Sequence, residues 1–102
     1  MPDLFDRLIN PAVTGDKMPV HTFRAAIGDY VAGQTTRNQI VAFWNLDTSA
    51  QSDLDALLVA VDAIGSNARK ALWLLQLHDV LLIAEAGAKY TTKSAFAARM
   101  GL

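Results

Sequence analysis

The stretch from Ala71 to Ala86 constrains the fold more than any other part of the sequence, because apolar residues occupy nearly every side of it when it is drawn as a helix. At 100° per residue its leucines, Val80 and Ile83 point in all directions around the helix axis. This pattern is typical of a helix enclosed by other helices, and we expect a central apolar helix over about residues 67–86. It does not predict a membrane span, because polar side chains interrupt it: Gln76, His78, Asp79 and Glu85.

Two shorter helices are expected before the middle of the chain. Apolar residues at helical spacing predict a helix from Val20 to Ala32, and Gly33 follows as the residue that ends it. Thr36 and Gln39 then fit a capping box, in which each side chain bonds to the backbone of the other residue at a helix start. A short, heavily apolar helix should therefore cover residues 37–45.

The second half of the chain continues in the same way. Thr48 and Gln51 fit another capping box, and the amphipathic helix that follows should end at Gly65. Ser66 or Asn67 is expected to cap the central helix, and a last short helix should cover residues 93–100. No stretch alternates with a period of two, so no strand is predicted. We expect an all-α fold: one domain over residues 1–102, a compact bundle of about five to six helices around the central helix.

Residues 1–18 are expected to form a separate N-terminal part. Leu4 and Leu8 lie on one side of a short helix, with Asp3 as its N-cap, and Pro11 ends it. This pattern predicts either a docking helix followed by a loop or an N-terminal arm. The first ten residues carry acids where a signal peptide needs a positive region. We therefore expect a cytoplasmic protein.

The end of the chain repeats features of its middle. Residues 26–46 align with residues 82–102 at a constant offset of 56, so that Thr35, Thr36 and Arg37 fall on Thr91, Thr92 and Lys93. Two interpretations stay open. The likeness is either ordinary helix-capping chemistry used twice or an internal duplication that places similar corners at two ends of the bundle.

Few side chains suit catalysis or cofactor binding. The chain has no cysteine, which excludes disulfides, thiolate metal sites and cysteine nucleophiles, and it has no phosphate-binding or nucleophile motif. His78 comes closest to a site, because Asp79 is its neighbour and Glu85 lies on the same helix face two turns later. A metal would need further ligands, and no spacing requires His21 or Asp29 to supply them. We therefore predict a structural histidine, no metal or cofactor, and no enzymatic activity.

Residues 36–64 superficially resemble a helix-turn-helix, so the alternative function is that of a small DNA-binding regulator. The net charge of −1 gives no general attraction to nucleic acid. No Lys or Arg occurs from Asn38 to Ala68, whereas several Asp residues do, and this pattern opposes phosphate binding. DNA contact would then fall to Arg37, Lys93 and Arg99.

Aromatic side chains beside an arginine favour a surface for protein contacts. Phe43 and Trp44 cannot both easily face inward on so short a helix, and Trp73 shares one side of the central helix with Arg69. Such combinations are typical of interface centres. The alternative is that these residues are core, and for Trp73 both alternatives stay open. The candidate interface residues are Trp73, Leu77, Val80, Arg69 and Trp44.

Residues 18–102 resemble small helical proteins encoded among the virion genes of tailed bacteriophages. The segments AGQTTRNQI and KYTTKSAFAARMGL carry most of this resemblance. It implies a structural or assembly role in a virus particle, with no catalytic residues. Our leading hypothesis is a non-enzymatic module that self-associates or docks on other protein subunits, either in the cytoplasm of the producing cell or in the virion.

Overall fold

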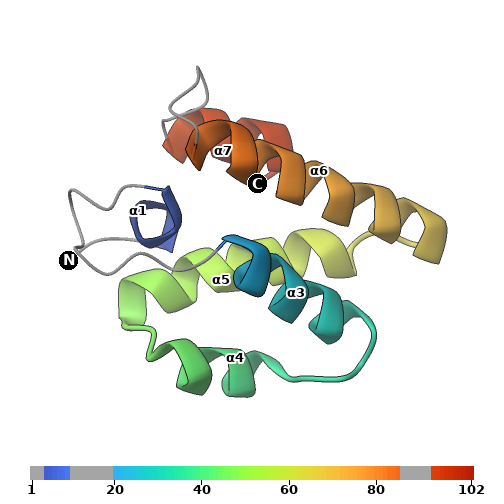
Figure 1. Cartoon of the computed structure of the whole chain (residues 1–102). Coiled ribbons are helices and arrows are strands. Elements are labelled where there is room, and N and C mark those ends of the chain that lie inside the picture. Colours follow the sequence, from blue (N-terminus) through green and yellow to red (C-terminus); the bar gives the residue numbers. More distant parts are fainter. Residues whose placement is uncertain (1–3, 10–19, 86–92) are drawn as a thin grey trace.

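The structure, a computed structural model, describes residues 4–9, 20–85 and 93–102 (Figure 1). Within these residues every regular element is a helix: α1 (Leu4–Ile9), α3 (Val20–Val31), α4 (Arg37–Trp44), α5 (Thr48–Asp62), α6 (Asn67–Glu85) and α7 (Lys93–Met100). The predicted all-α class is confirmed. In Figure 1, α6 lies above α3 and α5, α7 packs beside α6, and α4 lies below them. None of the described helices is long and apolar enough to cross a membrane.

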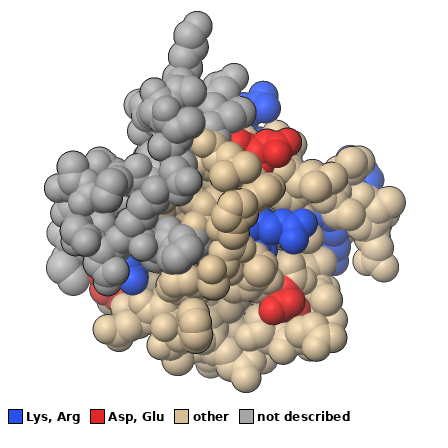
Figure 2. All heavy atoms as spheres, in the orientation of Figure 1, with Lys and Arg blue, Asp and Glu red and all other residues tan. Residues whose placement is uncertain are grey.

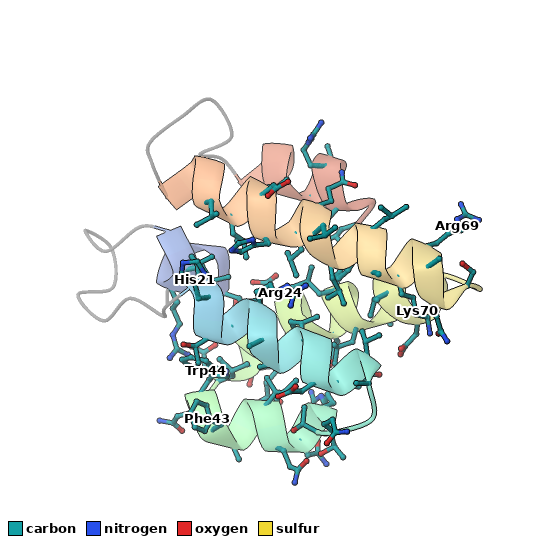
Figure 3. All side chains as sticks on the ribbon, turned by 45° about the vertical axis from the view of Figure 1, so that its right-hand side comes forward. His21, Arg24, Phe43, Trp44, Arg69 and Lys70 are labelled. Atoms are coloured by element: carbon teal, nitrogen blue, oxygen red, sulfur yellow. The ribbon has the colours of Figure 1, made fainter. Side chains whose placement is uncertain are left out.

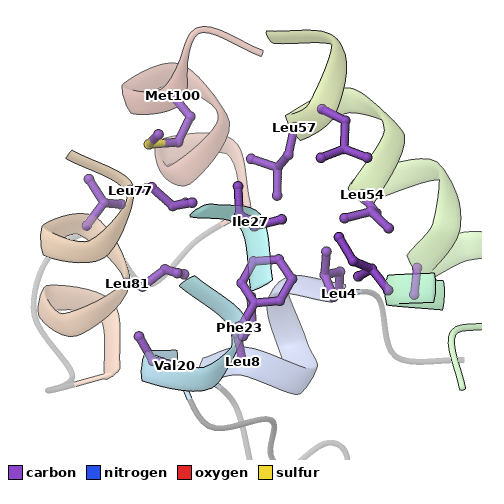
Figure 4. Packing of buried hydrophobic residues seen from close by; sticks show 14 of the residues in the cluster. Leu4, Leu8, Val20, Phe23, Ile27, Leu54, Leu57, Leu77, Leu81 and Met100 are labelled. Carbon is purple, nitrogen blue, oxygen red and sulfur yellow. The ribbon is translucent and has the colours of Figure 1, made fainter. Parts of the chain in front are cut away.

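The core lies where α1, α3, α5 and α6 meet (Figure 4). Phe23 and Ile27 of α3 are fully buried, because α3 packs on both α5 and α6. α1 packs on the same two helices through the buried Leu4 and Leu8, and the Leu4 amide donates a hydrogen bond of 3.1 Å to Asp53 Oδ2. The described part of residues 1–18 thus docks in the core of its own chain, whereas the loop expected after Asn10 lies outside the described residues.

Helix starts follow the predicted chemistry with one exception. Thr36 and Gln39 form the expected capping box, and the Ser66 hydroxyl accepts a hydrogen bond from the Arg69 amide at the start of α6. The capping box predicted for Thr48 and Gln51 is wrong. Asp47 is the N-cap of α5, and its carboxylate accepts from the Ala50 amide at 2.9 Å.

The side chain of Gln51 shows why that second capping box does not form. Its Nε2 donates to the Leu46 carbonyl at 2.9 Å, and its Oε1 accepts from Arg37 at 3.2 Å. With Asp47 as the N-cap, the third position of α5 is Ala50, so Gln51 lies one position beyond the place that a capping box uses. Gln51 therefore joins α5 to α4 instead of capping it.

α6 buries one face, so the expectation that it is enclosed on all sides is wrong. Leu77, Val80 and Leu81 are fully buried, but Leu72 and Leu75 are 65% and 54% exposed. Among the described helices, α1, α3 and α7 make the main contacts with α6, and Leu72 and Leu75 stay exposed beside them. One apolar face of this helix is therefore buried, and the other is exposed.

The predicted likeness between the middle and the end of the chain extends to backbone geometry. The amides of Leu46 and Leu102 donate to the carbonyls of Val41 and Ala97, at 3.1 and 3.0 Å. The residues before them, Asn45 and Gly101, have φ values of 52° and 75°. α4 and α7 thus end in the same left-handed motif at the offset of 56. The threonine pair expected before α7 lies outside the described residues.

Candidate interaction surface on helix α6

Two of the predicted interface residues line a hollow on the surface. Arg69 and Trp73 lie around it together with three neighbours, and its volume is about 230 Å³: the other lining residues are Ile64, Leu72 and Gln76. Arg69 is exposed at the start of α6 (Figure 3), and Trp73 is half-buried. The structure therefore brings together the arginine and the aromatic side chain that the sequence placed on one side of the helix.

The C-terminal turn of α7 forms one edge of this region. Trp73 Nε1 donates to the Met100 carbonyl at 3.3 Å, and Gln76 Nε2 donates to the Arg99 carbonyl at 2.7 Å. These carbonyls have no partner within the helix, because a helix leaves its last four carbonyl groups without one. Met100 itself is 3% exposed. The polar edges of Trp73 and Gln76 are thus used to hold α7 against α6.

Leu77 and Val80 do not belong to the surface, and this part of the prediction is corrected. Both side chains are 0% exposed and belong to the core. Leu77 lies on the opposite side of α6 from Leu72 and Leu75. Val80 shares the sector of Arg69 and Trp73 but lies about two to three turns further along the helix, where α6 is covered. An all-round apolar helix gives no sign in the sequence of which face turns inward, and here the face with Leu77 and Val80 does.

One exposed face of α6 forms a line of residues that we call the α6 stripe, with three apolar members and an aspartate at its far end: Ala68, Leu72, Leu75 and Asp79. These residues are spaced by four, three and four positions, so they follow one side of the helix. Arg69 and Gln76 flank the line, and both are exposed. The stripe thus has an apolar centre with polar residues beside and beyond it, which is the anatomy of a protein-contact surface.

Trp44 lies on α4, far from this surface (Figure 3). It is half-buried, its Nε1 has no hydrogen-bond partner within the described residues, and its carbonyl accepts from Arg7 at 2.9 Å. Phe43 is 74% exposed and stands edge-on to Trp44, with 5.0 Å between the ring centroids. The expectation that these two rings cannot both face inward is confirmed. Together with Ile40 and α3 they line a second hollow, of about 360 Å³.

The structure brings the two histidines together, a pairing that the sequence did not predict. His78 Nε2 lies 3.2 Å from His21 Nδ1, and their ring centroids are 5.2 Å apart. Asp79 is exposed on the α6 stripe, and Asp29 lines the hollow beside α4. In the described part of the chain, no three His, Asp or Glu residues form a group that could hold a metal ion. The pair joins α3 to α6. The predicted partner Glu85 ends α6, and its side chain is not among those that the structure describes.

Arg37, a candidate for DNA contact, is held between α4 and α5. Its guanidinium donates to both carboxylate oxygens of Asp55, at 2.9 and 3.2 Å. These hydrogen bonds hold the pKa of Asp55 below its usual value and raise the pKa of Arg37. The Arg37–Asp55 pair has no net charge, so it attracts phosphate less than a guanidinium without a carboxylate partner would. Figure 2 shows a few basic and a few acidic groups scattered among uncharged residues on the described part of one face.

Comparisons with known proteins do not identify the chain. No known protein family matches it, and no match is found among curated proteins or solved structures.

Proposed function

We propose that this chain is a non-enzymatic protein–protein interaction module, a self-associating or assembly subunit, which makes contact through the α6 stripe and the hollow beside it. The observation that carries the proposal is the exposure of Leu72 and Leu75, at 65% and 54%, on a helix whose opposite face is fully buried. When a second surface covers exposed leucines on a rigid helix, the free energy of the system falls, because apolar area is removed from water. A partner surface would thus complete the enclosure that the sequence of α6 predicts.

The composition of this surface supports protein contact over small-molecule chemistry. Trp73 and Arg69 line the hollow, and both residue types are enriched at the energetic centres of interfaces. Gln76 supplies a polar margin, and Arg69 is the charged side chain in the lining. No nucleophile stands beside a base in this set of residues, as covalent catalysis would require.

A place in a bacteriophage particle is the biological setting that we propose. The support is the resemblance of residues 18–102 to small helical proteins encoded among the virion genes of tailed bacteriophages. In this proposal the chain is made in the cytoplasm of the producing cell and is carried in the particle. Mass spectrometry of purified particles should find the chain at a fixed ratio to the capsid protein, and its absence from them would count against this setting.

Light scattering on the purified chain tests the contact surface. We expect the solution mass to rise with protein concentration and to change little between low and high salt, because the contact is mainly apolar. Leu72→Asp should return the protein to the monomer mass, since it puts a charge at the centre of the stripe.

Val59→Asp is the matched control for that experiment. Val59 is 68% exposed on α5, so the same chemical change there should leave association unchanged. The circular dichroism of both variants should match that of the parent, which separates loss of contact from loss of fold. An oligomer that Leu72→Asp leaves intact would contradict the proposed surface.

A further inference from the structure

We propose that the α6 stripe binds the same stripe of a second copy of this chain, with the two helices antiparallel about a twofold axis between Leu72 and Leu75. The inference rests on the proposed function and names the partner and the geometry of its surface. Residues of the stripe recur at spacings of four, three and four, the spacing at which two helices meet along a seam. With the axis there, Leu72 of each copy faces Leu75 of the other.

Charge decides between the two directions in which such helices can pair. Arg69 and Lys70 lie at the start of α6, Asp79 lies further along it, and no ion pair joins Arg69 or Asp79 to another described residue. In a parallel pair like charges would face each other at both ends. In an antiparallel pair each Arg69 guanidinium lies beside the Asp79 carboxylate of the second copy. The twofold axis makes this contact twice.

The shape of the surface fits the same arrangement. Ala68 and Ala71 are exposed and small, so they allow a second helix to approach closely. The hollow lined by Leu72, Trp73 and Arg69 lies directly beside the stripe, where Leu75 of the second copy would project. A leucine seated there is covered on several sides, which is how side chains interlock in paired helices. The partner that fits this surface is therefore a helix with a central leucine and an acidic end, and α6 itself is such a helix.

Engineered cysteines report the direction of the pair, because the chain has no cysteine of its own. In the proposed dimer Ala68 faces Asp79 of the second copy, and the two Ala68 residues lie roughly 16 Å apart along the seam. An equimolar mixture of Ala68→Cys and Asp79→Cys should therefore give a disulfide-linked dimer on oxidation, and Ala68→Cys alone should not. Val59→Cys, placed on another helix, controls for random collision. A dimer from Ala68→Cys alone would show a parallel pair and overturn the proposal.

Charge reversal tests the end contacts by sedimentation equilibrium. Arg69→Asp and Asp79→Arg should each raise the dimer dissociation constant by about five- to tenfold, since each change creates two repulsive contacts. The double variant Arg69→Asp/Asp79→Arg should restore the parent value, because it exchanges the two charges without changing their sum. Failure of the double variant to recover would contradict the antiparallel contact.

The outcomes separate this inference from the proposed function. If Leu72→Asp abolishes association but Ala68→Cys alone forms the disulfide-linked dimer, the proposed contact surface is supported and the antiparallel arrangement is contradicted. If association survives Leu72→Asp, both the proposed contact surface and the antiparallel arrangement are contradicted. If the chain is a monomer at every concentration, a second copy is not the occupant of the stripe and the inference is overturned.

Discussion

Asn45 shows how much of this fold depends on single backbone positions. It ends α4 in the left-handed region, at a φ of 52°, where a side chain costs free energy that glycine avoids. At the corresponding position 56 residues later the chain has Gly101, also at positive φ. Asparagine tolerates this region better than most residues, so the same turn is made by two different residue types.

Substitution of Asn45 should change stability in both directions. We expect Asn45→Gly to raise the free energy of unfolding by roughly 0.5 kcal/mol and Asn45→Ala to lower it by about 1 kcal/mol, because only the backbone preference changes. Denaturant unfolding followed by circular dichroism measures both values. Equal stability of the two variants would mean that the left-handed conformation is not kept in solution.

The Arg37–Asp55 pair should give the protein a defined sensitivity to acid. Hydrogen bonds from Arg37 lower the folded-state pKa of Asp55, so the folded state binds the proton less readily than the unfolded chain. The stabilisation is thus present above the usual carboxylate pKa of about 4 and is lost as the pH falls through the folded value. Its size is small, because both side chains are partly exposed and solvent screens them.

Asp55→Asn isolates this effect. At pH 7 the variant should be less stable than the parent, and the difference should shrink as the pH falls through the lowered pKa of Asp55, because the parent carboxyl then becomes protonated too. Asp29→Asn is the control, because no described residue pairs with its carboxylate. A stability difference that stays constant from pH 7 to pH 3 would show that the amide acts through something other than the charge.

At the scale of helices, α1 depends most clearly on packing. A helix of six residues is too short to be stable alone, since forming its first turn loses more conformational entropy than its few hydrogen bonds offset. α1 persists because Leu4 and Leu8 are buried against α5 and α6. The N-terminal segment is thus part of the core of this chain.

Truncation of the Leu8 side chain measures that dependence. Leu8→Ala should lower the free energy of unfolding by about 2–5 kcal/mol, the usual range for a fully buried leucine. Leu102→Ala removes the same atoms at a site that is 46% exposed and should cost less than about 0.5 kcal/mol. Similar losses at both sites would argue against burial of α1.

Local signals in the sequence predict most of these helices, and long-range placement is what they miss. The capping box at Thr36 was predictable because its two partners lie three residues apart. At the start of α5, Asp47 and Thr48 are both good caps, and it is Asp47 that accepts from the Ala50 amide, while Gln51 contacts Arg37 of another helix. The contact between His21 and His78 depends on how α3 and α6 pack, and no sequence spacing encodes it.

The same limit explains the partial success at the candidate site. The composition of α6 predicted Trp73 and Arg69 on one side, and they do line one hollow. It could not show that Leu77 and Val80 turn inward and Leu72 and Leu75 outward, because all four are apolar. Only the positions of α1, α3 and α7 decide which of two equally apolar faces is covered.

Across the whole molecule, the two tryptophans stand on different helices. Trp73 lies in α6 beside the stripe and the end of α7, whereas Trp44 lies in α4, on the other side of α3 and α5 (Figure 1). Tryptophan emission depends on the polarity around the ring, and these two surroundings change independently. The chain therefore contains two separate optical probes, one at the proposed contact surface and one away from it.

Single-tryptophan variants turn this placement into an assay. In Trp44→Phe the remaining Trp73 should shift its emission to shorter wavelength as the protein is concentrated, because a partner would displace water from the hollow. In Trp73→Phe the emission of Trp44 should not depend on concentration. If the two variants respond alike, association involves more of the molecule than α6. The intrinsic fluorescence of the unlabelled protein could thus report whether a second copy covers the surface around α6 or the surface around α4.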